Sequence, residues 1–225
     1  MTGKQIGSKY GFIANGLFQS EEEIANSATV KGYKALPGYI KYVDRNGDGI
    51  ITAAQDQGYV GKSATPKHTG SLNLFGNWKG FDFDLLFSWG LGNVVALTGQ
   101  YTASGSEGTQ DNTSFTKPFY HGGNSPTFLV ENSWTPDHTN AEFPRLEITG
   151  PSNNNGYSST FWYRNGNYMR LKTAQIGYNF PKKWLNPAGI EGLRLYVEGY
   201  NLLTFSGLTK YNIDPESPAV NNGYY

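Results

Sequence analysis

The clearest pattern along the chain is a strict alternation of apolar and polar residues. Between residues 81 and 89 every odd-numbered position is apolar, and three of the four even-numbered positions are polar. A period of two places the apolar side chains on one face of a β-strand and the polar side chains on the other. The pattern therefore predicts a strand that is apolar on one face only.

Other runs predict further strands. Residues 71–78 alternate in the same way, and Lys79-Gly80 between the two runs predicts a tight hairpin turn. Residues 193–205 alternate as well. In the run 168–180 the apolar phase changes partway, which a bulge near Lys172-Thr173 would explain.

The remaining chain predicts a short helix and long loops. Ser20 and Glu23 have the spacing of a capping box, which predicts a helix over residues 21–27. Residues 99–166 are mostly loop-like, and loops this long are usually functional or mobile. Short turns on one side of the strands and long loops on the other are typical of outer-membrane barrels.

Composition narrows the classes of protein that fit. The 225 residues contain 18 Lys and Arg and 18 Asp and Glu, and this balance argues against a nucleic-acid-binding protein. The absence of cysteine excludes disulfides and thiolate metal sites. Because no apolar run reaches about 18 residues, a transmembrane helix is excluded too.

Alternating strands fit both a soluble β-sandwich and a transmembrane β-barrel. Strand length favours the membrane, because about 9–11 tilted residues cross the hydrocarbon layer and several of the runs are that long. Aromatic residues near the strand ends could form interfacial girdles: Trp78, Phe81, Trp89, Tyr168 and Phe180.

Short motifs along the chain occur in the order of a known family. The most specific is Asn167-Tyr168-Met169-Arg170-Leu171-Lys172, followed by Ile176-Gly177-Tyr178. The others are Gly16-Leu17-Phe18-Gln19-Ser20, Asp44-Arg45-Asn46-Gly47-Asp48-Gly49, Trp78-Lys79-Gly80-Phe81-Asp82, Trp134-Thr135-Pro136, Phe143-Pro144-Arg145, Leu193-Arg194-Leu195-Tyr196, Tyr200-Asn201-Leu202 and Asp214-Pro215-Glu216. With these motifs the chain resembles the C-terminal part of SusC/RagA-type TonB-dependent outer-membrane transporters of the Bacteroidetes.

The resemblance implies a mainly β fold of antiparallel strands. These strands would form the C-terminal part of a transmembrane β-barrel of about 22 strands, with long extracellular loops and one short helix. Residues 1–66 would be a loop and short-helix segment, and residues 67–225 the barrel strands with their loops. Because no plug, TonB box, signal peptide or closing strand is recognisable, we expect the chain to be the last third or less of such a transporter.

The resemblance also implies a function and partners. The whole protein would import oligosaccharides or similar polymer fragments, glycan or peptide, across the outer membrane of a Gram-negative bacterium. A SusD-like surface lipoprotein would cover the barrel, and the TonB complex would act on the plug. The alternative, from another class, is a soluble all-β carbohydrate-binding module with a structural calcium site.

Residues 44–56 have the donor spacing of an EF-hand-like calcium loop. The candidate ligands are Asp44, Asn46, Asp48, the Ile50 carbonyl and Asp56. The segment departs from the pattern because its twelfth position is Gln55 and the acid follows one residue later. The alternative is an Asn/Gly turn whose side chains cap their own backbone; if calcium binds, its role would be structural.

Aromatic residues in the long loops are candidates for ligand binding. Trp134, Trp162 and Tyr163 lie near amide-rich stretches, and rings beside amides suit the apolar faces of sugars. The alternative is that these rings pack the loops together. Because no nucleophile elbow, phosphate loop or dinucleotide fingerprint occurs, we expect no enzymatic activity.

Overall fold

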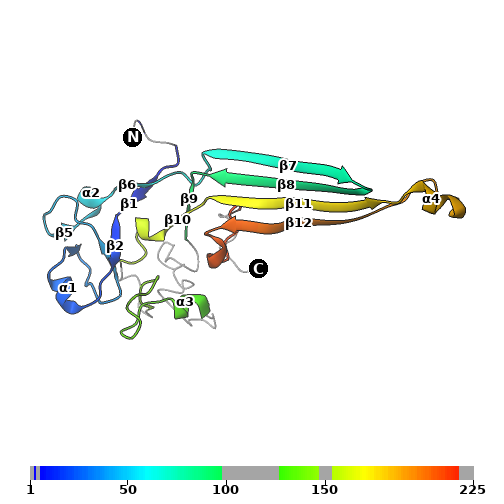
Figure 1. Ribbon diagram of the computed structural model, residues 1–225. Coiled ribbons are helices and arrows are strands. Elements are labelled where there is room, and N and C mark those ends of the chain that lie inside the picture. Colours follow the sequence, from blue (N-terminus) through cyan, green and yellow to red (C-terminus); the bar gives the residue numbers. More distant parts are fainter. Residues whose placement is uncertain (1–2, 4–5, 98–126, 147–153, 218–225) are drawn as a thin grey trace, which may run out of the picture. The chain divides into compact units, whose positions relative to one another are not determined.

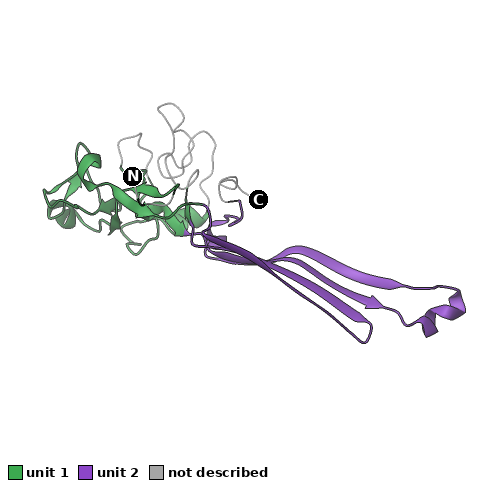
Figure 2. Cartoon of the chain, turned by 90° about the horizontal axis from the view of Figure 1, so that it is seen from above, with its two compact units in different colours: residues 1–64, 94–164, 218–225 green, residues 65–93, 165–217 purple. Residues whose placement is uncertain are grey.

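The computed structural model describes residues 3, 6–97, 127–146 and 154–217. The chain divides into two compact units (Figure 2). The sheet unit comprises residues 65–93 and 165–217, and the loop unit comprises residues 1–64, 94–164 and 218–225. The first boundary is close to the expected division at residue 66, but residues 94–164 group with the N-terminal residues rather than with the strands.

The sheet unit consists of four long antiparallel strands in the order β12-β11-β8-β7 (Figure 1). Their bounds are His68–Trp78 for β7, Phe81–Leu91 for β8, Tyr168–Asn179 for β11 and Arg194–Ser206 for β12. All four coincide with the runs of alternating residues, and the predicted antiparallel β fold is confirmed.

The turn between β7 and β8 is the predicted tight hairpin. Lys79 and Gly80 have φ angles of 49° and 92°. Positive φ at both central residues defines a type I′ turn, whose twist matches that of the flanking strands. A side chain at Gly80 would also come within 2.9 Å of the Tyr178 ring.

The predicted bulge in β11 is present at Lys172. Against β8, Leu171 lies opposite Phe87 and Thr173 opposite Leu86, so that Lys172 is the extra residue. The register with β12 shifts at the same place. Residues directly opposite each other share a face, so the apolar residues before and after the bulge lie on one face of the sheet: Met169, Leu171, Ala174, Ile176 and Tyr178.

Short helices complete the sheet unit. The connection from β11 to β12 contains α4 (Lys182–Leu185) and η5 (Asn186–Ala188), and η6 (Thr209–Tyr211) follows β12. The segment around η6 is anchored by buried apolar side chains, those of Leu208, Tyr211 and Ile213.

The loop unit is built from short strands that pair two by two. The pairs are β1 (Lys9–Gly11) with β6 (Gly58–Gly61), β2 (Ala14–Leu17) with β4 (Ile40–Tyr42), β3 (Thr29–Val30) with β5 (Ile50–Ile51), and β9 (Val94–Ala96) with β10 (Tyr163–Asn165), whose last residue belongs to the sheet unit. The helices are α1 (Glu21–Ala25), α2 (Ala53–Asp56), α3 (Thr127–Glu131) and η4 (Thr160–Trp162).

Helix α1 begins as the capping box predicts. The Glu23 amide donates to Ser20 Oγ at 3.1 Å, and the Glu23 carboxylate accepts in return from the Gln19 amide at 2.7 Å. Lys41 forms an ion pair with the same carboxylate, and the pKa of Glu23 is lowered chiefly by the Lys41 hydrogen bond. The helix start is thereby tied to the strand β4.

The amide-rich segment at residues 154–155 lies inside the loop unit. The Tyr42 hydroxyl donates to the Asn154 carbonyl at 2.8 Å, and the Ile40 amide donates to Asn155 Oδ1 at 2.9 Å. Burial raises the pKa of Tyr42, so the phenol stays protonated. No helix of the described residues has both the length and the apolar character needed to cross a membrane.

Candidate functional site

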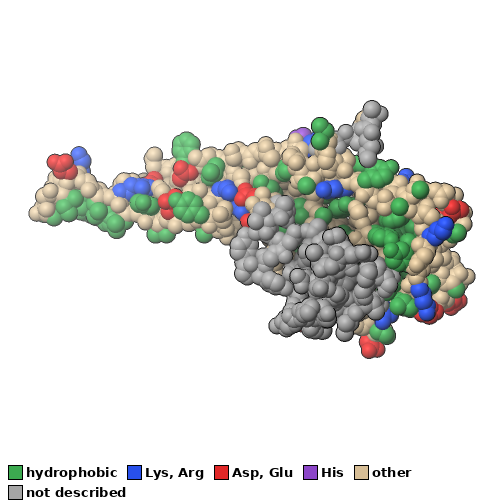
Figure 3. Space-filling view, turned by 180° about the vertical axis from the view of Figure 1, so that it is seen from behind, with side chains coloured by type: hydrophobic (Ala, Val, Ile, Leu, Met, Phe, Trp, Pro, Cys, Tyr) green, Lys and Arg blue, Asp and Glu red, His purple; other side chains and the backbone are tan. Residues whose placement is uncertain are grey.

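One face of the four-stranded sheet is apolar along the whole length of the strands. Its side chains are those of Leu72, Leu74, Trp78, Phe81, Phe83, Leu85, Phe87, Trp89, Met169, Leu171, Ala174, Ile176, Tyr178, Leu195, Val197, Leu203 and Phe205. Many of them are open to the surroundings; Ile176 is 60% exposed and Val197 is 78% exposed. Figure 3 shows hydrophobic side chains along the surface of these strands, with charged side chains among them.

Two rings of this face lie over glycines on the neighbouring strand. Gly70 is opposite Trp89, and Gly76 is opposite Phe83. A Cβ atom at Gly70 would come within 2.4 Å of the Trp89 ring, and one at Gly76 within 2.9 Å of the Phe83 ring. The glycines therefore leave the space into which these rings fold.

The length of the apolar face matches a bilayer. From Leu195 to Phe205 a strand extends about 33 Å at about 3.3 Å per residue. At the tilt of about 40° that is usual in membrane barrels, this length covers about 25 Å along the membrane normal, the height of the apolar band of such barrels.

The opposite face carries paired charges. Arg194 donates to both carboxylate oxygens of Asp82, at 3.0 Å and 2.5 Å, and to Gln175 Oε1 at 2.6 Å. Asn179 donates to the same carboxylate at 2.8 Å. Asp82 is thus engaged in structural contacts, which suits a polar wall rather than acid–base chemistry.

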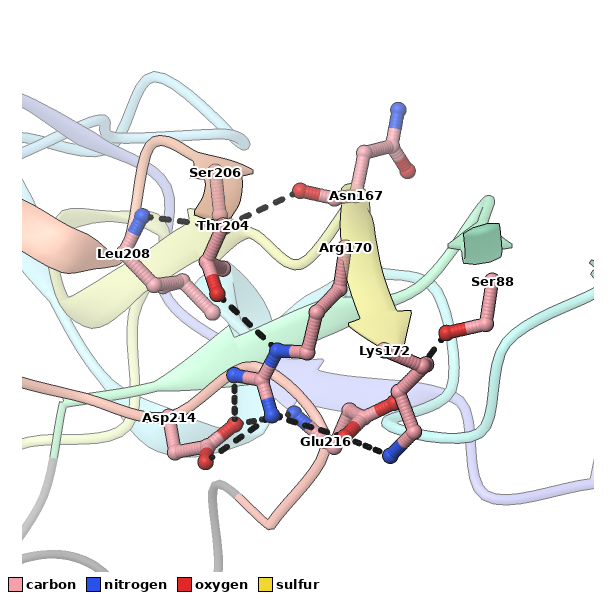
Figure 4. Close-up of polar contacts among 9 residues, drawn as sticks. All are labelled: Ser88, Asn167, Arg170, Lys172, Thr204, Ser206, Leu208, Asp214 and Glu216. Carbon is pink, nitrogen blue, oxygen red and sulfur yellow. Dashed lines mark hydrogen bonds and ion pairs between the residues drawn. The ribbon is translucent and has the colours of Figure 1, made fainter. Parts of the chain in front are cut away.

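A second cluster of charges holds the segment that follows β12 against this polar face (Figure 4). Arg170 donates to Asp214 at 2.7 Å and 3.3 Å and to Glu216 at 2.7 Å. Its Nε atom donates to Thr204 on β12 at 2.9 Å. Glu216 also pairs with Lys172, the bulge residue, at 2.9 Å.

In this charge cluster of Arg170, Lys172, Asp214 and Glu216, the arginine is buried and the other three side chains are partly exposed. The Arg170 side chain is only 7% exposed. Burial alone would raise the pKa of Asp214, but hydrogen bonds from Arg170 and from the Glu216 amide outweigh it and hold that pKa below its usual value. The Asp214 carboxylate therefore stays charged, and the segment stays attached, at neutral pH.

The candidate calcium loop folds on its own backbone. Asp44 accepts from the Gly47 and Gly49 amides, both at 2.7 Å, and Asp48 accepts from the Ile50 amide at 2.8 Å. The pKa of Asp44 is lowered, chiefly by the hydrogen bond from Gly49. Such contacts suit the capped-turn alternative.

Asp56, the last candidate calcium ligand, is fully buried. Its two oxygens accept from the Arg45 amide at 2.9 Å and the Thr52 amide at 2.7 Å. The buried carboxylate therefore joins the two ends of the loop. Within the described residues no group of three or more His, Cys, Asp and Glu side chains is placed to hold a metal ion. Calcium binding here stays a prediction.

Trp134 joins three of the sequence motifs. Its amide donates to the Phe143 carbonyl at 2.9 Å, and its indole donates to Gln19 at 3.1 Å. The ring lies against Gly38, where an added Cβ would come within 2.6 Å of it. Trp134 is only 5% exposed and borders a shallow pocket, lined also by Ser133, Thr135, Pro136, Arg145 and Leu146.

Trp162 and Tyr163 lie on another segment of the loop unit, and Trp162 contacts Phe143 as Trp134 does. Trp162 is 3% exposed, donates to the Asn155 carbonyl at 2.6 Å and stacks on Phe143. The Tyr163 hydroxyl bonds to Ser158 at 2.8 Å. These placements suit rings that pack the loops together, and binding of a ligand by Trp134, Trp162 or Tyr163 stays a prediction.

The charge cluster was missed as a site by the sequence analysis. Arg170 and the Asp214-Pro215-Glu216 motif were noted there only as separate motifs. The signal available in the sequence was that Arg170 occupies a polar position of one predicted strand and that Asp214 and Glu216 follow the next predicted strand. Their pairing depends on how β11 and β12 align, which alternation alone does not specify.

The sequence is similar to those of curated TonB-dependent receptors. TonB-dependent receptor P3 of Formosa agariphila is 32% identical over 216 residues, which are 96% of this chain and 19% of the receptor. TonB-dependent receptor P26 of the same organism is 28% identical over 205 residues, or 89% of this chain and 18% of the receptor. The chain thus spans about a fifth of the length of these relatives. No family model matches it.

The fold is similar to that of chains in solved structures of the RagAB peptide importer. The match to its open-open state has a TM-score of 0.58 at 22% identity, and covers 93% of this chain and 20% of that chain. The match to its closed-closed state has a TM-score of 0.55 at 23% identity, with the same coverage. The names of these proteins are those of receptors and importers, in agreement with the expectation that the chain is not an enzyme.

Proposed function

This chain is related to TonB-dependent receptors over nearly its whole length, and from this premise we propose that it forms part of the wall of an outer-membrane β-barrel that imports nutrients. The shared fold with chains of the RagAB importer supports the barrel assignment. Transport itself would belong to the whole protein, of which this chain is one portion.

The exposed apolar face of the sheet is the observation that carries the proposal. Soluble monomers rarely expose contiguous apolar patches larger than a few hundred Å². Here the apolar residues continue across all four strands, while the other face holds the Asp82–Arg194 pair and the charge cluster. This division suits a wall between lipid and an aqueous lumen, and it disfavours the alternative of a soluble carbohydrate-binding module.

The connections suggest how the wall is oriented. At one end β7 and β8 are joined by two residues and β11 and β12 by residues 180–193, whereas residues 92–167 separate β8 from β11 at the other end. Outer-membrane barrels have short turns on the periplasmic side and long loops outside. The loop unit would accordingly lie among the extracellular loops.

The same relatives suggest candidates for partners and cargo. We propose a SusD-like surface lipoprotein as partner and energy from the TonB complex, acting on a plug elsewhere in the protein. The cargo would be an oligosaccharide or a peptide: the sequence resemblance suggests the first, and the name of the RagAB peptide importer the second. Polymer fragments of either class present the polar groups that a polar lumen can bind.

Arginine substitutions on the two faces test the proposal. In the full-length protein, Leu74→Arg places a charge near the middle of the apolar face, and Asn73→Arg places the same charge on the polar face of the same strand. An arginine facing lipid at the bilayer midplane costs about 2–4 kcal/mol. We expect Leu74→Arg to reduce strongly the amount of folded, heat-modifiable barrel in outer-membrane fractions, and Asn73→Arg to leave it near wild type.

Two further results would decide the matter. Uptake of oligosaccharides and of peptides is measured in cells that carry either variant. The cargo class is the one whose uptake is lower with Leu74→Arg than with Asn73→Arg. If Leu74→Arg assembles as well as Asn73→Arg, the apolar face does not contact lipid and the proposal is wrong.

A further inference from the structure

The end of the sheet that carries the short turns combines aromatic rings with lysines. The rings form a row that runs from the strands into the connection between β11 and β12. The distances between neighbouring ring centroids are 4.6 Å for Phe81 and Tyr178, 5.1 Å for Tyr178 and Phe180, and 6.4 Å for Phe180 and Trp184. Trp184 on α4 is 58% exposed. The apolar face thus ends in a row of aromatic rings that is partly exposed.

Three lysines stand at the same end. Lys79 is in the hairpin turn, and its Nζ atom lies 4.7 Å from the centre of the exposed Trp78 ring. Lys182 and Lys183 begin α4. The two turns adjoin each other, since the Asn179 amide donates to the Gly80 carbonyl at 2.7 Å.

The charge of this end is positive. All three lysines are exposed, and in the part of the chain that the structure describes none of them forms an ion pair. The nearby acids are Glu191, which is exposed, and Asp82, which is neutralised by Arg194. The lysines therefore keep their charge available for an external anion.

We propose that Lys79, Lys182 and Lys183, flanked by Trp78 and Trp184, bind the phosphate headgroups of anionic phospholipids at the membrane surface. The proposal rests on the proposed function, because it requires the apolar face to lie in lipid. Tryptophan rings are enriched at headgroup level, and lysine extends its charge toward the headgroups while its stem stays on apolar surface. The short-turn end would meet the periplasmic leaflet.

Binding of phosphatidylglycerol to the full-length protein tests this site. The purified protein in detergent is titrated with phosphatidylglycerol or phosphatidylethanolamine, and bound lipid is measured by native mass spectrometry. Each lysine near an anionic surface contributes about a fivefold change in affinity. We expect the variant Lys79→Gln/Lys182→Gln/Lys183→Gln to bind phosphatidylglycerol roughly 100-fold more weakly and phosphatidylethanolamine as before.

A matched variant controls for the loss of charge. Lys31, Lys34 and Lys62 are exposed lysines of the loop unit, and their combined replacement by glutamine should leave phosphatidylglycerol binding unchanged. Replacement of the three turn lysines by arginine should preserve binding. Inorganic phosphate at the lipid concentration should not compete; if it does, the site takes soluble phosphate instead.

Failure of this inference can be told from failure of the proposed function. If the turn-lysine variant assembles normally and still binds phosphatidylglycerol like the control variant, the lipid site is disproved and the barrel wall is unaffected. If Leu74→Arg assembles normally, the sheet does not face lipid and both proposals are overturned.

Discussion

Arg170 connects two distant parts of the sequence through a single side chain. Its guanidinium contacts Thr204 on the neighbouring strand and both acids of the Asp214-Pro215-Glu216 motif. A planar guanidinium presents five donors in a fixed fork that pairs with carboxylates through two bonds, whereas a lysine presents three donors on a single nitrogen. The residue is therefore a cation of the polar face that also holds the segment after β12 in place through its ion pairs, and we call this contact the clasp.

Removal of this clasp should free the segment after β12. Replacing Arg170 by glutamine leaves two carboxylates without their main partner, and breaking a buried ion pair costs about 3–5 kcal/mol. Since Asp214 and Glu216 are about a quarter exposed, we expect a smaller loss of about 2 kcal/mol. Hydrogen exchange at residues 207–217 of the full-length protein should become faster.

Lys172→Gln is the comparison for this prediction. Lys172 is more exposed than Arg170 and makes one ion pair, with Glu216, so its loss should change exchange in the segment by less than about 1 kcal/mol. Equal effects of the two substitutions would mean that Arg170 has no special role.

At the scale of the element, the bulge in β11 decides which face its side chains join. Without the extra residue Lys172, either Met169 and Leu171 or Ile176 and Tyr178 would turn to the polar face, because a one-residue shift reverses every side chain. In the sequence the apolar residues of this strand change from odd-numbered to even-numbered positions, and the bulge keeps them on one face.

Deleting Lys172 should prevent assembly of the barrel, whereas Lys172→Ala should allow it. The deletion moves two apolar residues from the apolar face to the polar face, but the substitution keeps the register and removes only the pair with Glu216. The yield of heat-modifiable protein in outer-membrane fractions measures the difference. Normal assembly of the deletion variant would show that the register is not set at this residue.

Local signals accounted for the individual elements. Alternation located the four long strands, Lys79-Gly80 located the hairpin, and Ser20 with Glu23 located helix α1. Each depends on neighbours within a few residues. The pairing of β8 with β11 spans at least 78 residues, and the contacts of Arg170 span at least 34, so local propensity carries no information on them.

The loop unit shows the same limit. Asn154 and Asn155 lie in the stretch predicted to be mostly loop, and they are buried because they bond Tyr42, Ile40 and Trp162. Sequence pattern does not reveal this burial, because Ile40 and Tyr42 lie more than 100 residues away from these asparagines along the chain.

At the scale of the whole molecule, the sheet needs neighbours. In the described residues β7 and β12 each pair on one side only, which leaves two rows of free amides and carbonyls. Free edges recruit other strands, and lipid does not tolerate them. In a longer protein, further barrel strands would satisfy both edges.

Produced without the rest of the protein, this chain should therefore self-associate in detergent. Size-exclusion chromatography with light scattering should show oligomers or aggregates for the 225-residue chain and a single species for the full-length protein. A monodisperse monomer of the isolated chain that needs no detergent would favour the soluble carbohydrate-binding module instead.

The glycines beneath Trp89 and Phe83 give the apolar face a further property. Since each of these two rings folds into the space over a glycine, Trp89 and Phe83 add less height to the face than rings standing upright would. A lipid acyl chain beside the sheet would meet a flatter surface at these two positions than the size of the side chains implies.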